Sequence, residues 1–109
     1  TLNKGNHHFV IADLTATGVI DELCSDLINQ GKNPDIIVNN LGGTLGVNDP
    51  LCSASDFLRL MQFNLGIAID INRRFIPHMQ SQKWGSKYYC ADLSTELYYH
   101  NYPSRIFPR

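Results

Sequence analysis

Blocks of apolar and polar residues along the chain predict two short strands and two helices. Residues 9–12 and 36–38 are continuous apolar runs, a pattern typical of strands buried on both faces in a parallel sheet. Between them, apolar residues recur at helical spacing, and Gly31 with Asn33-Pro34 ends that segment. The apolar positions of this helix are Ile20, Leu23, Cys24, Leu27 and Ile28. The order strand, helix, strand predicts a right-handed βαβ unit with parallel strands.

A second, longer helix is predicted over residues 54–79, after a glycine-containing loop over residues 41–52. Ser53, with Asp56 three residues later, resembles a capping box at its start. Pro77 has no amide hydrogen and is expected to kink or end the helix near His78, with Gly85 as the stop signal after it. The expected buried stripe is Phe57, Met61, Asn64, Ala68, Ile71 and Phe75.

The composition changes after Gly85. All five tyrosines of the chain lie in the segment 86–109, which has no clean period of two or of 3.6 residues. Pro103 and Pro108 interrupt its end. We therefore expect an organised domain over residues 1–85 and an irregular tail over residues 86–109.

Charge and cysteine usage exclude several classes of function. Nine basic and ten acidic residues give a net charge of −1, which argues against a nucleic-acid or an anionic-membrane partner. No apolar run reaches the roughly 18 residues that cross a bilayer. Three cysteines without a CxxC motif predict a reducing, cytoplasmic location, and the histidines show no metal-ligand spacing. The first residue is Thr1, so the reading frame is expected to begin further upstream.

Polar residues and glycines follow both predicted strands. Asp13 ends the first strand, and Asn39 and Asn40 end the second, where ligands bind in open parallel sheets. Gly42 and Gly43 allow a close approach of the backbone to a ligand. This edge suits a nucleotide-sized ligand. The residues alone also fit a tight strand-to-loop turn, in which Asn and Gly are ordinary.

Three segments, "ADLT", "DIIVNNLGG" and "MQFNLGIAIDINRRFIPHM", together resemble the middle of a short-chain dehydrogenase/reductase. The family has a strand ending in Asp-hydrophobic, a strand running into Asn-Asn-Ala-Gly, and a helix that carries an Asn and finishes near Pro-x-Met. Their order and spacing agree over residues 9–85, although Leu41 replaces the usual Ala and Gly43 is an additional glycine. The resemblance implies an α/β fold, an incomplete Rossmann-type doubly wound parallel sheet with a βαβα core, over residues 1–85.

The resemblance also implies a cofactor, NAD or NADP, and a role for each matching residue. Asp13 would accept a hydrogen bond from the adenine amino group, and the Leu14 backbone would pair with the ring. Asn39 and Gly42 would pass along the adenosine side, and Asn40 would brace the central strands. No metal ligand is implied.

Asn64 would be the family's catalytic asparagine, which bends the helix and holds a water molecule in a proton relay. On its own residues, Asn64 also fits a satisfied buried side chain that ties a helix kink to a neighbouring segment. A third possibility is a helix rotated so that Asn64 lies at the edge of the apolar stripe.

Several of the family's motifs are not found in these 109 residues. The phosphate-binding turn Thr-Gly-x-x-x-Gly-x-Gly is expected before Thr1. The catalytic Ser should follow "KWG", and Tyr-x-x-x-Lys should come later. The residues four positions after the tyrosines are Asp92, Leu93, Tyr102, Pro103 and Ile106. None is lysine. In the family, "KWG" runs directly into an apolar strand ending in serines, so the abrupt change in composition here suggests a frameshift or a truncated, degenerate gene, and we favour a frameshift over a divergent tail in segment 86–109.

The sequence thus predicts a fragment of an NAD(P)-dependent oxidoreductase acting on a small carbonyl or alcohol substrate, inactive as this isolated chain. The alternative is a non-catalytic interaction module that forms a homo-oligomer through the helix 54–79, as this helix commonly does in the family. Its second apolar edge is Leu58, Leu65, Ile69 and Ile76. A flavodoxin-like regulator ranks lower, because it does not predict Asn64 or the Asn-Asn-Leu-Gly run.

Overall fold

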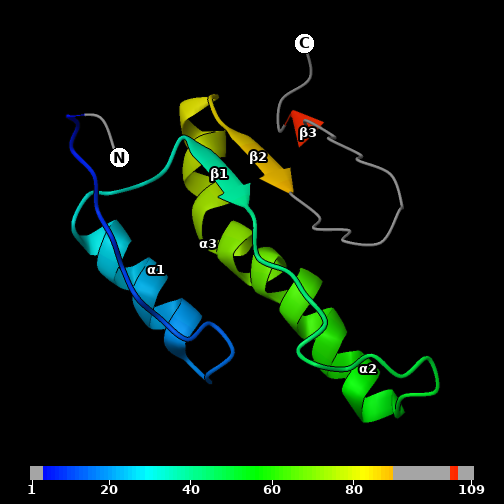
Figure 1. The fold of residues 1–109 in the computed structure, drawn as a ribbon. Coiled ribbons are helices and arrows are strands. Elements are labelled where there is room, and N and C mark those ends of the chain that lie inside the picture. Colours follow the sequence, from blue (N-terminus) through cyan, green and yellow to red (C-terminus); the bar gives the residue numbers. More distant parts are fainter. Residues whose placement is uncertain (1–3, 90–103, 106–109) are drawn as a thin grey trace.

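The structure, a computed structural model, describes residues 4–89 and 104–105. The elements are α1 (Val19–Asn29), β1 (Ile36–Asn39), α2 (Ala54–Met61), the π-helical segment η1 (Gln62–Gly66), α3 (Ile67–Gln82), β2 (Ser86–Tyr89) and β3 (Ser104–Arg105). β1 pairs in parallel with β2, and β2 pairs antiparallel with β3, so the strand order is β1-β2-β3 (Figure 1).

The parallel βαβ unit of the structure is not the one that the sequence predicts. β1 and β2 pair from Ile36 opposite Ser86 to Asn39 opposite Tyr89, and the long helix α2–η1–α3 connects them. β2 and β3 lie in the segment predicted to be irregular, so that prediction is wrong over residues 86–89 and 104–105. Tyrosine favours strands, and the edge of β1 supplies the pairing that local periodicity does not reveal. Residues 90–103 and 106–109 of the predicted tail lie outside the described residues.

The predicted strand over residues 9–12 is absent. Phe9 and Ile11 are 77% and 102% exposed, and the segment forms no strand. A strand needs a neighbouring edge to pair with, and within the described residues the sheet consists of β1, β2 and β3 only. The segment instead runs back along α1. The Nδ1 atom of His8 lies 3.3 Å from Nζ of Lys32, beyond the C-terminus of α1.

A single apolar core joins α1, β1 and α3. Its buried members are Cys24, Ile37, Phe75 and Met79. Both helices therefore pack on the face of β1 that carries Ile37. Ile36 and Val38, on the other face, are 57% and 59% exposed, so the prediction that this strand is buried on both faces is wrong. The described residues form a partial, Rossmann-like α/β fold. Helices on both faces, the mark of a doubly wound sheet, stay a prediction.

The long helix begins where the sequence predicts and continues past the predicted end. The Ser53 hydroxyl accepts a hydrogen bond from the amide of Asp56 at 3.1 Å and caps the helix. Pro77 lies inside α3, which continues to Gln82 and ends with Lys83 in the left-handed conformation, ahead of Gly85. A proline costs the helix one hydrogen bond, and the burial of Met79 beyond Pro77 holds the last turn in place.

The predicted buried stripe is only half right. Ala68 and Phe75 are buried, whereas Phe57, Met61 and Asn64 are exposed. η1 explains the change of face, because a π-helical turn adds a residue and rotates the preceding part of the helix relative to α3. Positions that are counted at a constant 3.6-residue period across residues 62–66 therefore no longer face the core on the N-terminal side of this turn.

Candidate functional site

Asn64 joins η1 to the loop that follows β1. Its Nδ2 donates hydrogen bonds to the carbonyl oxygens of Gly43 at 2.9 Å and Leu60 at 2.8 Å. Its Oδ1 accepts a hydrogen bond from the amide of Gly43 at 2.8 Å. This reciprocal pair fixes the loop backbone against the helix. Asn64 is thus a satisfied side chain that ties a bent helix to a neighbouring segment, although it is exposed rather than buried.

Two glycines of this loop are favoured for different reasons, Gly42 by its close approach to Asn64 and Gly43 by its backbone conformation. A Cβ atom placed on Gly42 would lie 3.0 Å from Oδ1 of Asn64, tighter than ordinary van der Waals contact. Gly43 has a φ of 150°, a conformation that side chains disfavour. The π-helical turn brings Asn64 to this loop, with the amide of Ile67 bonded to the carbonyl of Gln62. Such turns are frequent at functional sites.

Asn39, at the end of β1, meets a residue that sequence reasoning missed. Its Nδ2 donates to Oδ1 of Asn72 on α3 at 3.5 Å. Asn72 is 4% exposed, the one buried polar residue in the described part of the chain. It follows Ala68 by four residues and precedes Phe75 by three. This helical spacing of a polar residue among apolar ones was the signal that could have identified it.

Asp13 and Leu14 lie in the turn before α1. Oδ1 of Asp13 accepts hydrogen bonds from the amide of Thr15 at 3.0 Å and from its hydroxyl at 2.6 Å. The Thr15 hydroxyl, followed by the Thr15 amide, lowers the pKa of the Asp13 carboxyl below its usual value. Asp13 is exposed, whereas Leu14 is half-buried.

Two adjoining pockets separate this turn from the long helix. One has a volume of about 490 Å³ and an apolar wall that includes Leu14, Phe63 and Ile67. Leu14 therefore shares a pocket with residues that flank Asn64. Asn40 and Gly42 are exposed on the loop beside it. The structure thus brings Gly42 and Asn64 together directly and Leu14 across a pocket, whereas the printed contact of Asn39 is with Asn72.

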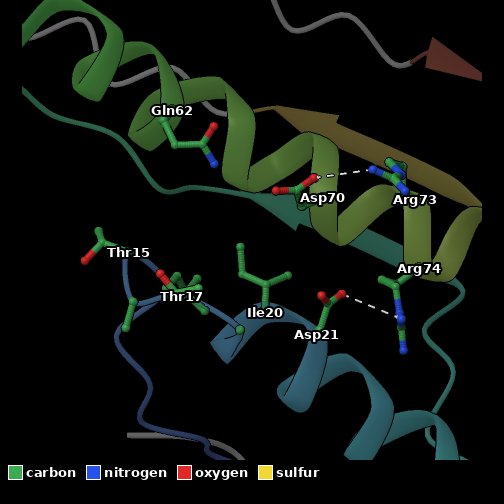
Figure 2. A pocket seen from close by; sticks show the side chains of 11 residues that line it. Thr15, Thr17, Ile20, Asp21, Gln62, Asp70, Arg73 and Arg74 are labelled. Carbon is green, nitrogen blue, oxygen red and sulfur yellow. Dashed lines mark ion pairs between the residues drawn. The ribbon is translucent and has the colours of Figure 1, made fainter. Parts of the chain in front are cut away.

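The second pocket, of about 390 Å³, lies between the N-terminus of α1 and the long helix. Figure 2 shows two ion pairs at its wall, between Asp70 and Arg73 at 3.9 Å and between Asp21 and Arg74 at 3.6 Å. Arg74 also donates to the hydroxyl of Ser25 at 2.6 Å and so ties α3 to α1. The paired charges cancel, so this pocket has no excess of positive charge for an anion.

Other kinds of site find no support in the described part of the chain. No group of three or more His, Cys, Asp or Glu side chains there could hold a metal ion. Burial raises the pKa of the Cys24 thiol, which opposes its use as a thiolate nucleophile. Over residues 4–89 and 104–105, every helix is too short or too polar for a bilayer span.

Comparison with known proteins gives a consistent set of relatives. No protein-family model matches the chain. The NADPH-dependent pterin aldehyde reductase of Arabidopsis thaliana is 34% identical over 82 residues, which make up 73% of this chain and 34% of that protein. The chain therefore spans about a third of the length of this relative.

Solved structures agree with that match. NADH-dependent reductase A1-R', responsible for alginate metabolism, superimposes with a TM-score of 0.57 and 26% identity, over 67% of this chain and 30% of its own. It has also been crystallised with NAD. A candidate short-chain dehydrogenase/reductase from Burkholderia xenovorans superimposes with a TM-score of 0.59 over 72% of this chain and 30% of its own. At 22% identity, this second likeness shows the fold alone.

Proposed function

Because this chain belongs to the short-chain dehydrogenase/reductase family, we propose that it is part of an NAD(P)-dependent oxidoreductase. The intact parent would transfer hydride between the nicotinamide and a carbonyl or alcohol carbon of a small molecule. The cofactor supplies that chemistry, and the protein positions it. The observation that carries the proposal is the pair of hydrogen bonds between Asn64 and Gly43, beyond the carboxyl end of β1.

The cofactor would lie along the edge formed by Asn39–Gly43 and the turn at Asp13 and Leu14. The glycines leave the loop backbone open to the adenosine side. A carboxylate accepts up to about four hydrogen bonds. Asp13 can therefore keep its bonds from Thr15 and still accept one from the adenine amino group. Its lowered pKa keeps it ionised and able to accept.

Asn64 would act by positioning. Both of its amide hydrogens are already donated, to Gly43 and to Leu60, so its side chain has no hydrogen left for a substrate or a water molecule. We propose that it fixes the cofactor edge and the bend of the helix. A water molecule in a proton relay would then be held by backbone groups of the bent helix.

We expect the isolated 109-residue chain to be inactive. It contains neither the phosphate-binding glycine motif nor a Tyr-x-x-x-Lys pair. The test is to incubate the chain with NADPH or NADH and a panel of aldehydes and ketones, and to follow the cofactor absorbance. The reductase from Arabidopsis thaliana serves as the positive control with a pterin aldehyde. Turnover above the blank would refute the predicted inactivity.

A second candidate function is self-association through the long helix. Leu58 is 66% exposed, and Leu65 and Ile69 are also exposed along the same helix. We expect sedimentation to give a dimer, and Leu65→Glu to yield monomers because a buried carboxylate in the interface is costly. Leu51→Glu, in the loop before the helix, is the control and should leave the dimer unchanged. A chain that stays monomeric at high concentration would contradict this function.

A further inference from the structure

We infer that Asn72 is a positioning residue, which acts with Asn64 to hold the segment 39–43 at both of its ends. Asn72 holds Asn39 at the end of β1, and Asn64 holds Gly43 four residues later. Both anchors come from the same long helix. The inference rests on the proposed function only in identifying this segment as the cofactor edge.

The burial of Asn72 gives it a reason to bond with Asn39. It is 4% exposed, on the helix face that also buries Ala68, Phe75 and Met79. An amide in such surroundings costs free energy unless it is hydrogen-bonded. Asn39 is half-buried and offers its Nδ2 from the neighbouring strand. An apolar residue at position 72 could not accept the hydrogen bond from the Asn39 side chain.

By ideal helix and chain geometry, the spacing of the two anchors is close to the full length of the segment. Asn64 and Asn72 are eight residues apart, which corresponds to about 12 Å along a helix. From Asn39 to Gly43 is four residues, and an extended chain of that length spans at most about 14 Å. The segment therefore has little slack. Release of its Asn39 end should loosen its Gly43 end, although Asn72 forms no part of the contacts at Gly43.

The coupling between the Asn39 end and the Gly43 end of the segment distinguishes a positioning role of Asn72 from a purely structural role. A residue that only stabilises the fold changes the exchange of all core amides together. Substitution of a residue that positions the segment also raises the hydrogen-exchange rate of the Gly43 amide, by more than the rates of the core amides rise. The amide of Gly43 is a suitable reporter because it donates to Oδ1 of Asn64.

The test is amide hydrogen exchange by NMR on the 109-residue chain without cofactor. Asn72→Leu should speed exchange at Gly43 about fivefold beyond any change in the core amides of α1 and α3, the effect of one lost hydrogen bond. Asn39→Val removes the same bond from the other side and should give the same excess. Phe75→Leu is the matched control, which should raise core exchange with no excess at Gly43.

Equal changes at Gly43 and in the core for both Asn variants would overturn the inference. In the unaltered chain, nuclear Overhauser effects must connect the side-chain amide of Asn39 with Asn72, and their absence would also overturn it, even if the variants fail to fold. No cofactor enters these measurements. The proposed function is tested separately, by NAD(P)H turnover in an intact reductase that carries residues 9–85, so its failure would leave the role of Asn72 intact.

Discussion

Gly85→Ala is expected to lower the free energy of unfolding by about 3 kcal/mol, from steric overlap and backbone strain together. A Cβ atom on Gly85 would lie 2.6 Å from Cγ of Met79 and 2.7 Å from its sulfur. Met79 is 0% exposed and packed in the core, so its side chain has no free space to move into. Gly85 also has a φ of 154°, which an alanine rarely adopts. Urea unfolding of both proteins gives the difference.

Gly31→Ala is the matched control for this prediction. Gly31 follows α1 with a φ of 71°, and a Cβ atom there would have no neighbour within 4 Å. Gly31→Ala should therefore lower the free energy of unfolding only through backbone strain, by about 1–2 kcal/mol. If the two variants lost the same stability, the packing of Met79 against the start of β2 would not be the cause.

The second large effect is expected from Asn64→Ala on catalysis. The variant is best tested in a chimera, in which residues 9–85 of this chain replace the corresponding stretch of the Arabidopsis thaliana pterin aldehyde reductase. Loss of three hydrogen bonds would free Gly43 and the helix bend. A displacement of about 1 Å at the reacting groups costs about a hundredfold in rate. We expect kcat/KM of the chimera to fall by about that factor.

Asn29→Ala is the control for this loss, since Asn29 is an exposed residue at the end of α1, away from the cofactor edge. It should leave kcat/KM unchanged. Equal rates for Asn64→Ala and the unaltered chimera would contradict a positioning role for Asn64.

Local signals predicted the elements that depend on local chemistry. The helical spacing around Cys24, the turn at Gly31 and the cap at Ser53 all gave the correct element in the correct place. The Asn-Asn-Leu-Gly run also predicted the loop that meets Asn64. Each of these signals operates over a few residues and does not need the rest of the fold.

The failures come from features that depend on a distant partner. Residues 9–12 are apolar enough for a buried strand, but the described sheet does not include them. β2 has no periodic pattern and forms because β1 presents an edge to it. The π-helical turn at 62–66 has no sequence period of its own, so it hid the exposure of Phe57.

The most direct test of the account is NADPH oxidation by the unaltered chimera with a pterin aldehyde. If Asp13, Asn39, Gly42 and Asn64 form the cofactor edge of an oxidoreductase, the foreign segment should support turnover and NADPH binding in the relative. A chimera that folds, as judged by circular dichroism and a cooperative melt, but neither binds NADPH nor oxidises it would contradict the account.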